Sequence, residues 1–289
     1  MSVLSPTASV VAPDGNEPLR LVCQEIWGGN RAAATPVQLP GIRGWLHAQP
    51  CESLAGGDLH YLSVCGSGML SRLCVADVAG HGAAVAATSD VMHRHLRRCV
   101  NRTDQRRVLS ELNQLLVGEG QTEMATTAMV SYFPPTRRLT YSYAGHEAAW
   151  YYEAQTDRWE QLETTSRGMM DLPLAVDAET GFSQAKRRVA YGDRLLLFTD
   201  GLLEAPNSRG ELFGQERLRN VLELHRHRGC EELIDELNRA LARHTAGTLR
   251  KHDDLTLLAV EFVDDDRVPA LWRAIWNRIT RPRGNAQKA

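Results

Sequence analysis

Several common signatures are missing from this 289-residue sequence, and each absence excludes a class of protein. No apolar run approaches the roughly 18 residues that a membrane-spanning helix needs, and the first residues lack the basic and apolar regions of a signal peptide. The formal net charge of −2 provides no basic surface field for nucleic acid. We therefore expect a cytoplasmic protein with no nucleic-acid partner and no place in a membrane.

Signatures of nucleotide hydrolysis and of disulfide scaffolds are also missing. There is no Walker motif, so hydrolysis of a nucleotide through a P-loop is not supported. Strands and helices do not alternate regularly, which argues against a doubly wound parallel sheet. The six cysteines are scattered without a Cys-x-x-Cys pair, and several fall in apolar strands. We expect reduced, mostly buried thiols.

The most informative stretch is a predicted hairpin over residues 58–77. Its residues are mostly apolar and β-favouring, and a glycine-serine-glycine turn lies near the middle. If the turn is centred between positions 67 and 68, opposed residues have numbers that sum to 135, so Asp58 faces Asp77. Two like charges about 5 Å apart are unfavourable unless a cation lies between them. The hairpin is therefore a first indication of a metal site.

Hydrophobic periodicity predicts the other elements. The connections within residues 124–163 are short and rich in turn residues, which favours an antiparallel meander there. Thr103 is the predicted N-cap of the second helix. The expected helices are 83–99, 104–117, 215–224 and 231–244, and the other expected strands are 19–27, 42–48, 124–133, 138–144, 148–153, 158–163, 182–189, 193–198 and 253–260.

The same patterns divide the chain into three parts. Residues 1–18 are small, polar and aperiodic, which is typical of a disordered tail. Residues 19–263 contain neither an internal repeat nor a linker, so we expect a single domain. Residues 264–289 are predicted to form an amphipathic helix and a basic tail. The apolar stripe of that helix could pack on the core, self-associate as a homodimer or contact a membrane surface; it consists of Leu271, Trp272, Ile275, Trp276 and Ile279.

Four aspartates form a second pattern that involves strand ends. Asp77 and Asp200 each end an apolar strand, whereas Asp58 and Asp253 each begin one. Antiparallel strands would bring these ends to one edge of the core. Carboxylate oxygens without His or Cys suit Mg²⁺ or Mn²⁺ better than Zn²⁺. The alternative is that aspartates simply favour strand ends and turns.

The motifs that contain these aspartates match a known family in order and spacing. Over about residues 50–263, the chain resembles the SpoIIE/RsbU-type bacterial serine phosphatases, which belong to the metal-dependent protein phosphatase superfamily with its protein phosphatase 2C-like fold. The segments that carry the resemblance are Ala55–Asp58, Val75–Gly82, Tyr143–His146, Leu172–Leu174, Gly192–Gly201, Glu211–Gly214 and Asp253–Thr256.

The resemblance implies an α+β fold, namely an α-β-β-α sandwich of two antiparallel sheets flanked by helices, with two Mn²⁺ or Mg²⁺ ions at one edge. It further implies that Asp77 bridges both metals and that the backbone carbonyl of Val78 binds one of them. Asp200 and Asp253 would complete the carboxylate shell of the second metal, and Asp58 would hold metal-bound water. His146 either borders this site or is a turn histidine bonded to the backbone.

The function implied by the resemblance is a metal-dependent serine/threonine phosphoprotein phosphatase that uses a hydroxide activated by two metals. Its expected substrate is a phosphorylated anti-anti-sigma-type regulator in a partner-switching pathway. The alternative is a catalytically weak module on the same fold that binds a phosphoprotein partner. Four mutually repelling carboxylates favour the enzyme, because a binding module has no need to keep them.

Overall fold

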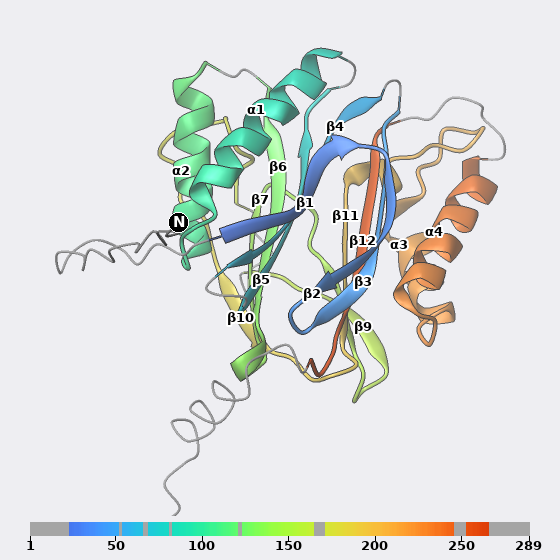
Figure 1. The fold of residues 1–289 in the computed structure, drawn as a ribbon. Coiled ribbons are helices and arrows are strands. Elements are labelled where there is room, and N and C mark those ends of the chain that lie inside the picture. The colour runs from blue at the N-terminus through green and yellow to red at the C-terminus, as the bar shows by residue number, and fades with distance from the viewer. Residues whose placement is uncertain are drawn as a thin grey trace, which may run out of the picture.

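The protein forms two antiparallel sheets that pack face to face, with helices on both outer faces (Figure 1). This computed structural model describes residues 23–51, 54–65, 69–80, 83–120, 123–164, 171–245 and 253–265. The predicted α-β-β-α sandwich is therefore confirmed. The predictions for the tail at 1–18 and for the apolar stripe of the C-terminal helix lie outside the described residues.

The first sheet contains the predicted hairpin. In β4 and β5, Leu59 pairs with Ala76 and Cys65 pairs with Leu70, so the predicted register is confirmed and places Asp58 opposite Asp77. Leu62 and Leu73 face the core between the sheets, whereas their neighbours face the helices. The described strands of this sheet are, in spatial order, β1 (Cys23–Arg31), β4 (Ala55–Cys65), β5 (Leu70–Val78), β6 (Ala125–Phe133), β7 (Arg138–Ala144) and β10 (Ala185–Arg188).

The second sheet is buried on both faces at its centre. In β11, Leu195 and Leu197 face the core between the sheets, while Leu196 and Phe198 pack under helices. This double burial explains the nearly continuous apolar run. The described strands are, in spatial order, β2 (Ala33–Leu39), β3 (Ile42–Gln49), β12 (Leu255–Phe262), β11 (Arg194–Phe198), β8 (Trp150–Glu153) and β9 (Arg158–Gln161).

One pair of helices covers each sheet (Figure 1). Helices α1 (Ala83–Cys99) and α2 (Gln105–Gly118) lie on the first sheet, and α3 (Gly214–Leu224) and α4 (Cys230–Thr245) lie on the second. The N-cap of α2 is Asp104 rather than Thr103, because the Asp104 carboxylate accepts a hydrogen bond from the backbone N–H of Arg106 at 3.1 Å. Short 3₁₀ turns are η1 (Pro134–Thr136) and η2 (Asp200–Leu202).

Two predictions about the strands need correction, and one strand was missed. The predicted meander is split, because β6 pairs with β7 and β8 pairs with β9, but β7 and β8 belong to different sheets. β1 continues through Gly28 and Gly29 instead of ending there, since irregular pairing with β4 accommodates the glycines. β2 was not predicted; it contains Pro36, which an edge strand tolerates because one side of it has no ladder to complete.

The cysteine prediction holds for four positions and fails at one. Cys51, Cys74, Cys99 and Cys230 are not disulfide-bonded, and all but Cys51 are buried. Burial raises the pKa of the Cys74 thiol to about 12. Cys65, in contrast, is disulfide-bonded, so the expectation of reduced thiols is wrong there.

None of the helices within the described ranges combines the length and the apolar character that crossing a membrane requires.

Candidate functional site

Each sheet contributes aspartates to a site between the two sheets. Asp58 lies in β4 and Asp77 in β5 of the first sheet. Asp200 lies two positions after the end of β11, and Asp253 lies two positions before the start of β12; both strands belong to the second sheet. The charges of Asp200 and Asp253 both act on Asp77. The predicted convergence of the four strand ends is thus what the fold produces.

Asp58 is the most enclosed member of the group, with 6% of its surface exposed. Its Oδ2 accepts a hydrogen bond of 2.7 Å from the Thr199 hydroxyl, which ties the first sheet to the second. Its Oδ1 is buried and has no hydrogen-bond partner among the described residues. Burial, and then the charge of Asp77, raise the pKa of Asp58 well above its usual range.

Asp77 and Asp200 also titrate abnormally. Burial, followed by the charges of Asp200 and Asp253, raises the pKa of Asp77 to about 8. Burial, followed by the charges of Asp253 and Glu204, raises the pKa of Asp200 to about 6. The carboxylates therefore destabilise one another's charged form, which is the condition that a bound cation would relieve.

The donor set fits a hard divalent cation. The four side chains offer only oxygen, and the unpartnered Oδ1 of Asp58 is a buried acceptor that lacks a donor. Within the described ranges, no three His, Cys, Asp or Glu side chains are already arranged to hold a metal ion. The carboxylates are thus close enough to affect one another's pKa, but in the described residues they are not arranged at the distances of ligands around a common ion.

Glycines let the backbones approach at this site. A Cβ on Gly57 would lie 2.8 Å from the carbonyl oxygen of Val78, the predicted backbone ligand. A Cβ on Gly201 would collide with the carbonyl oxygen of Asp254. These contacts explain why glycine precedes Asp58 and follows Asp200.

Asp254 has a role that the sequence did not reveal. It is 4% exposed, and its carboxylate accepts hydrogen bonds of 2.5 Å from the backbone N–H groups of Cys51 and Gly57. It therefore fastens the start of β4 to the start of β12. The doubled aspartate at 253–254 was a visible signal, but its two members could not be told apart without the fold.

His146 joins two strands that flank the site. It is 2% exposed; its Nε2 lies 3.0 Å from the carbonyl oxygen of Phe198, and its Nδ1 lies 2.7 Å from the hydroxyl of Thr126. The alternative of a turn histidine bonded to the backbone is correct. Its partner Thr126 pairs with Asp77 across β5 and β6, so this histidine also lies near the site. Burial lowers its pKa to about 4, so the ring is neutral.

The chain is similar to known proteins over most of its length. The sequence model for stage II sporulation protein E (SpoIIE) matches residues 68–263. Phosphoserine phosphatase RsbU from Bacillus subtilis is 23% identical over 214 residues, which are 73% of this chain and 60% of the relative. The present chain therefore spans less than two thirds of that relative's length.

Solved structures share the fold at low sequence identity. The SiaA-PP2C domain of Pseudomonas aeruginosa superimposes with a TM-score of 0.65 at 19% identity, covering 75% of this chain and 85% of that domain. The catalytic domain of the serine/threonine protein phosphatase PstP, solved with two manganese ions, gives a TM-score of 0.55 at 16% identity over 77% of this chain and 99% of its own. Together with the family match over 68–263, these likenesses establish that the chain belongs to the SpoIIE family and has the protein phosphatase 2C-like fold.

Proposed function

We propose that this protein is a metal-dependent phosphatase that removes phosphate from serine or threonine of a protein. The observation that carries the proposal is the meeting of Asp58, Asp77, Asp200 and Asp253 between the sheets, where burial and neighbouring carboxylates raise the pKa values of the first three. Membership of the SpoIIE family and similarity to the phosphoserine phosphatase RsbU support it.

The proposed cofactors are two Mn²⁺ or Mg²⁺ ions. Asp77 would contact both, and the Val78 carbonyl, Asp200, Asp253 and Asp58 would complete the site. The similar phosphatase PstP was solved with two manganese ions, which supports this number. Bound divalent ions of this kind supply a water of lowered pKa and neutralise negative charge on phosphoryl oxygens.

The protein's own residues prepare the site for that chemistry. Thr199 holds one oxygen of Asp58 and leaves the other as an acceptor that can orient a water. Gly57 and Gly201 keep the backbones close. Burial of Asp58 and Asp77 excludes bulk solvent and strengthens every electrostatic interaction at the site. No side-chain nucleophile is required.

The proposed substrate is a phosphorylated anti-anti-sigma-type regulator of a partner-switching pathway in the cytoplasm. This substrate class follows from the resemblance to SpoIIE/RsbU-type phosphatases. A protein substrate is compatible with a site whose proposed metal ligands come from both sheets. Only the phosphoryl group has to reach the aspartates, and the rest of the substrate protein can stay outside.

Turnover of p-nitrophenyl phosphate with Mn²⁺, and in chelator, tests the activity. We expect turnover that depends on Mn²⁺ and is lost in chelator. A phosphoserine peptide tests the substrate class in the same two conditions. Calorimetry of Mn²⁺ binding completes the experiment: a protein that binds Mn²⁺ but hydrolyses neither reagent would contradict the enzyme and support a module that binds phosphoproteins.

A further inference from the structure

His146 occupies a connection between the two sheets and is bonded at both ring nitrogens. It lies between β7 of the first sheet and β8 of the second, where the chain crosses from one sheet to the other. The Phe198 carbonyl can only accept, so Nε2 carries the proton and donates to it at 3.0 Å. Nδ1 then accepts from the Thr126 hydroxyl at 2.7 Å. One neutral tautomer therefore satisfies both partners.

Each partner of His146 is attached to one of the site aspartates. Thr126 is the cross-strand neighbour of Asp77 in the β5–β6 pair. Phe198 is the last residue of β11, two positions before Asp200. The link Thr126–His146–Phe198 therefore runs from the strand beside Asp77 in the first sheet to the strand that presents Asp200 in the second.

A second polar link joins the sheets nearby. The Thr199 hydroxyl donates to Asp58 at 2.7 Å and accepts from the backbone N–H of Thr256 at 2.9 Å. The backbone just before Asp200 is thus held from both sides. The two links therefore fix the backbone that carries Asp200 relative to the strands that carry Asp58 and Asp77.

We infer that His146 is a positioning residue that sets the separation between Asp77 and Asp200. It contacts neither aspartate and acts through Thr126 and Phe198. The inference rests on the proposed function only for the identity of the ion that these aspartates bind. Its consequence is that loss of the link weakens the binding of a divalent cation even when the fold is intact.

Calorimetric titration of substrate-free protein with Mn²⁺ tests this inference. His146→Gln keeps a donor within reach of the Phe198 carbonyl but removes the acceptor for Thr126, and Thr126→Val removes only a hydroxyl. Either variant breaks the same link, so we expect each to bind Mn²⁺ about tenfold more weakly, as outer-shell changes do. The double variant should bind no more weakly than the weaker single variant, because the link can be broken only once.

His95→Gln is the matched control. His95 is 3% exposed and lies on α1, where it pairs with Glu119 at 2.9 Å. Its replacement reports the general cost of changing a buried histidine and should leave Mn²⁺ affinity within about twofold of wild type. If His146→Gln fails to fold, judged by its circular dichroism, the nearly isosteric Thr126→Val variant decides the question alone.

The possible outcomes separate this inference from the proposed activity. Wild-type affinity for Mn²⁺ in Thr126→Val and His146→Gln would overturn the positioning role while leaving wild-type turnover intact. Additive losses in the double variant would also overturn it. Conversely, wild-type protein that binds Mn²⁺ without hydrolysing p-nitrophenyl phosphate would contradict the proposed phosphatase activity. Weaker Mn²⁺ binding in the variants would still support the role of His146.

Discussion

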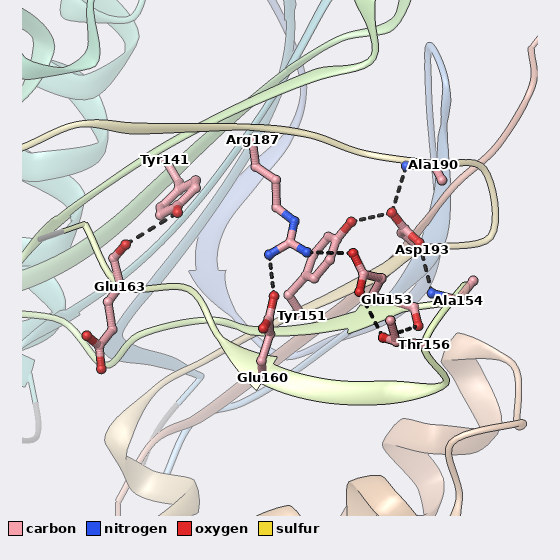
Figure 2. Close-up of polar contacts among 10 residues, drawn as sticks. All are labelled: Tyr141, Tyr151, Glu153, Ala154, Thr156, Glu160, Glu163, Arg187, Ala190 and Asp193. Atoms are coloured by element: carbon pink, nitrogen blue, oxygen red, sulfur yellow. Dashed lines mark hydrogen bonds and ion pairs between the residues drawn. The ribbon is translucent and has the colours of Figure 1, made fainter. Parts of the chain in front are cut away.

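Asp193 and Asp58 are both buried, but they differ in how far their carboxylate oxygens are satisfied. Asp193, 2% exposed, accepts hydrogen bonds from the backbone N–H of Ala154 at 2.9 Å, from that of Ala190 at 2.7 Å and from the Tyr151 hydroxyl (Figure 2). Arg187 stacks over the Tyr151 ring at 4.1 Å and bonds to Glu153 and Glu160. Every carboxylate oxygen of Asp193 has a partner.

Asp58 lacks such a complete set of partners among the described residues. Asp58 receives one hydrogen bond from Thr199 and has a buried oxygen without a donor, while the neighbours that act on Asp77 include three further carboxylates. The contrast teaches that burial of an aspartate does not mark a functional site. Unmet acceptors and mutual repulsion do, because a folded chain normally satisfies its buried polar groups. Asp193 is accordingly structural, and the site aspartates are available to a cation.

The largest expected effect is on turnover in Asp77→Asn. This change removes one carboxylate of the site, so we expect Mn²⁺-dependent hydrolysis of p-nitrophenyl phosphate to fall about a thousandfold or more. The thermal midpoint in chelator should not fall, since carboxylate repulsion is relieved. Retained activity in a folded Asp77→Asn variant would contradict the proposed metal site.

The second largest expected effect is on the pH dependence of stability, which the site aspartates should dominate. The folded-state pKa values of Asp77, about 8, and Asp200, about 6, lie above the unfolded value of about 3.9. The folded state therefore binds more protons, and the stability that these groups contribute below pH 4 is lost as pH rises through about 6 and 8. Between about pH 7 and 8, where the buried His60 and His146 are mostly neutral in both states, urea unfolding in chelator should show stability falling by on the order of 1 kcal/mol.

Two comparisons control the pH experiment. Asp77→Asn should flatten the fall, because a group whose pKa is raised to about 8 is gone. Saturating Mn²⁺ should raise wild-type stability at the upper end of this range, since a ligand that binds only the folded state stabilises it. Stability that rises with pH in chelator would contradict the arrangement of the site.

Asp193→Asn should have the opposite phenotype to Asp77→Asn. Asp193 now accepts hydrogen bonds from two backbone N–H groups and one hydroxyl. The NH₂ group of asparagine cannot accept, so at least one of these buried donors would lose its acceptor. We expect the free energy of unfolding to fall by about 2 kcal/mol. Turnover per folded molecule should match wild type, and a specific loss of turnover would break the distinction between the two groups.

Arg187→Gln should have the smallest effect. Its partners Glu153 and Glu160 are 35% and 52% exposed, so solvent screens these ion pairs. We expect less than about 1 kcal/mol of destabilisation in urea unfolding. A larger loss would mean that the Asp193 group depends on its charged outer partners as well as on its three donors.

Much of the fold was predictable because it depends on local periodicity. The hairpin register followed from counting across one turn, and the bounds of α1 followed from a run without proline or glycine that carries apolar residues at near-helical spacing. Asp58, Asp200 and Asp253 were recognisable because each lies near a strand end beside glycine or a second aspartate, and Asp77 because it lies near a strand end three residues before Gly80. Turn position, strand period and strand ends are all properties of short segments.

The sequence by itself thus determined the helices, most of the strands and the four aspartates, since each is encoded within about twenty consecutive residues. Only the tertiary structure decided that β7 and β8 lie in different sheets. The same holds for the hydrogen bond that Asp254 accepts from the backbone of β4 and for the link from Thr126 through His146 to Phe198. These features depend on which distant segments pack together. That choice is made by burial of the whole core, and no single segment records it.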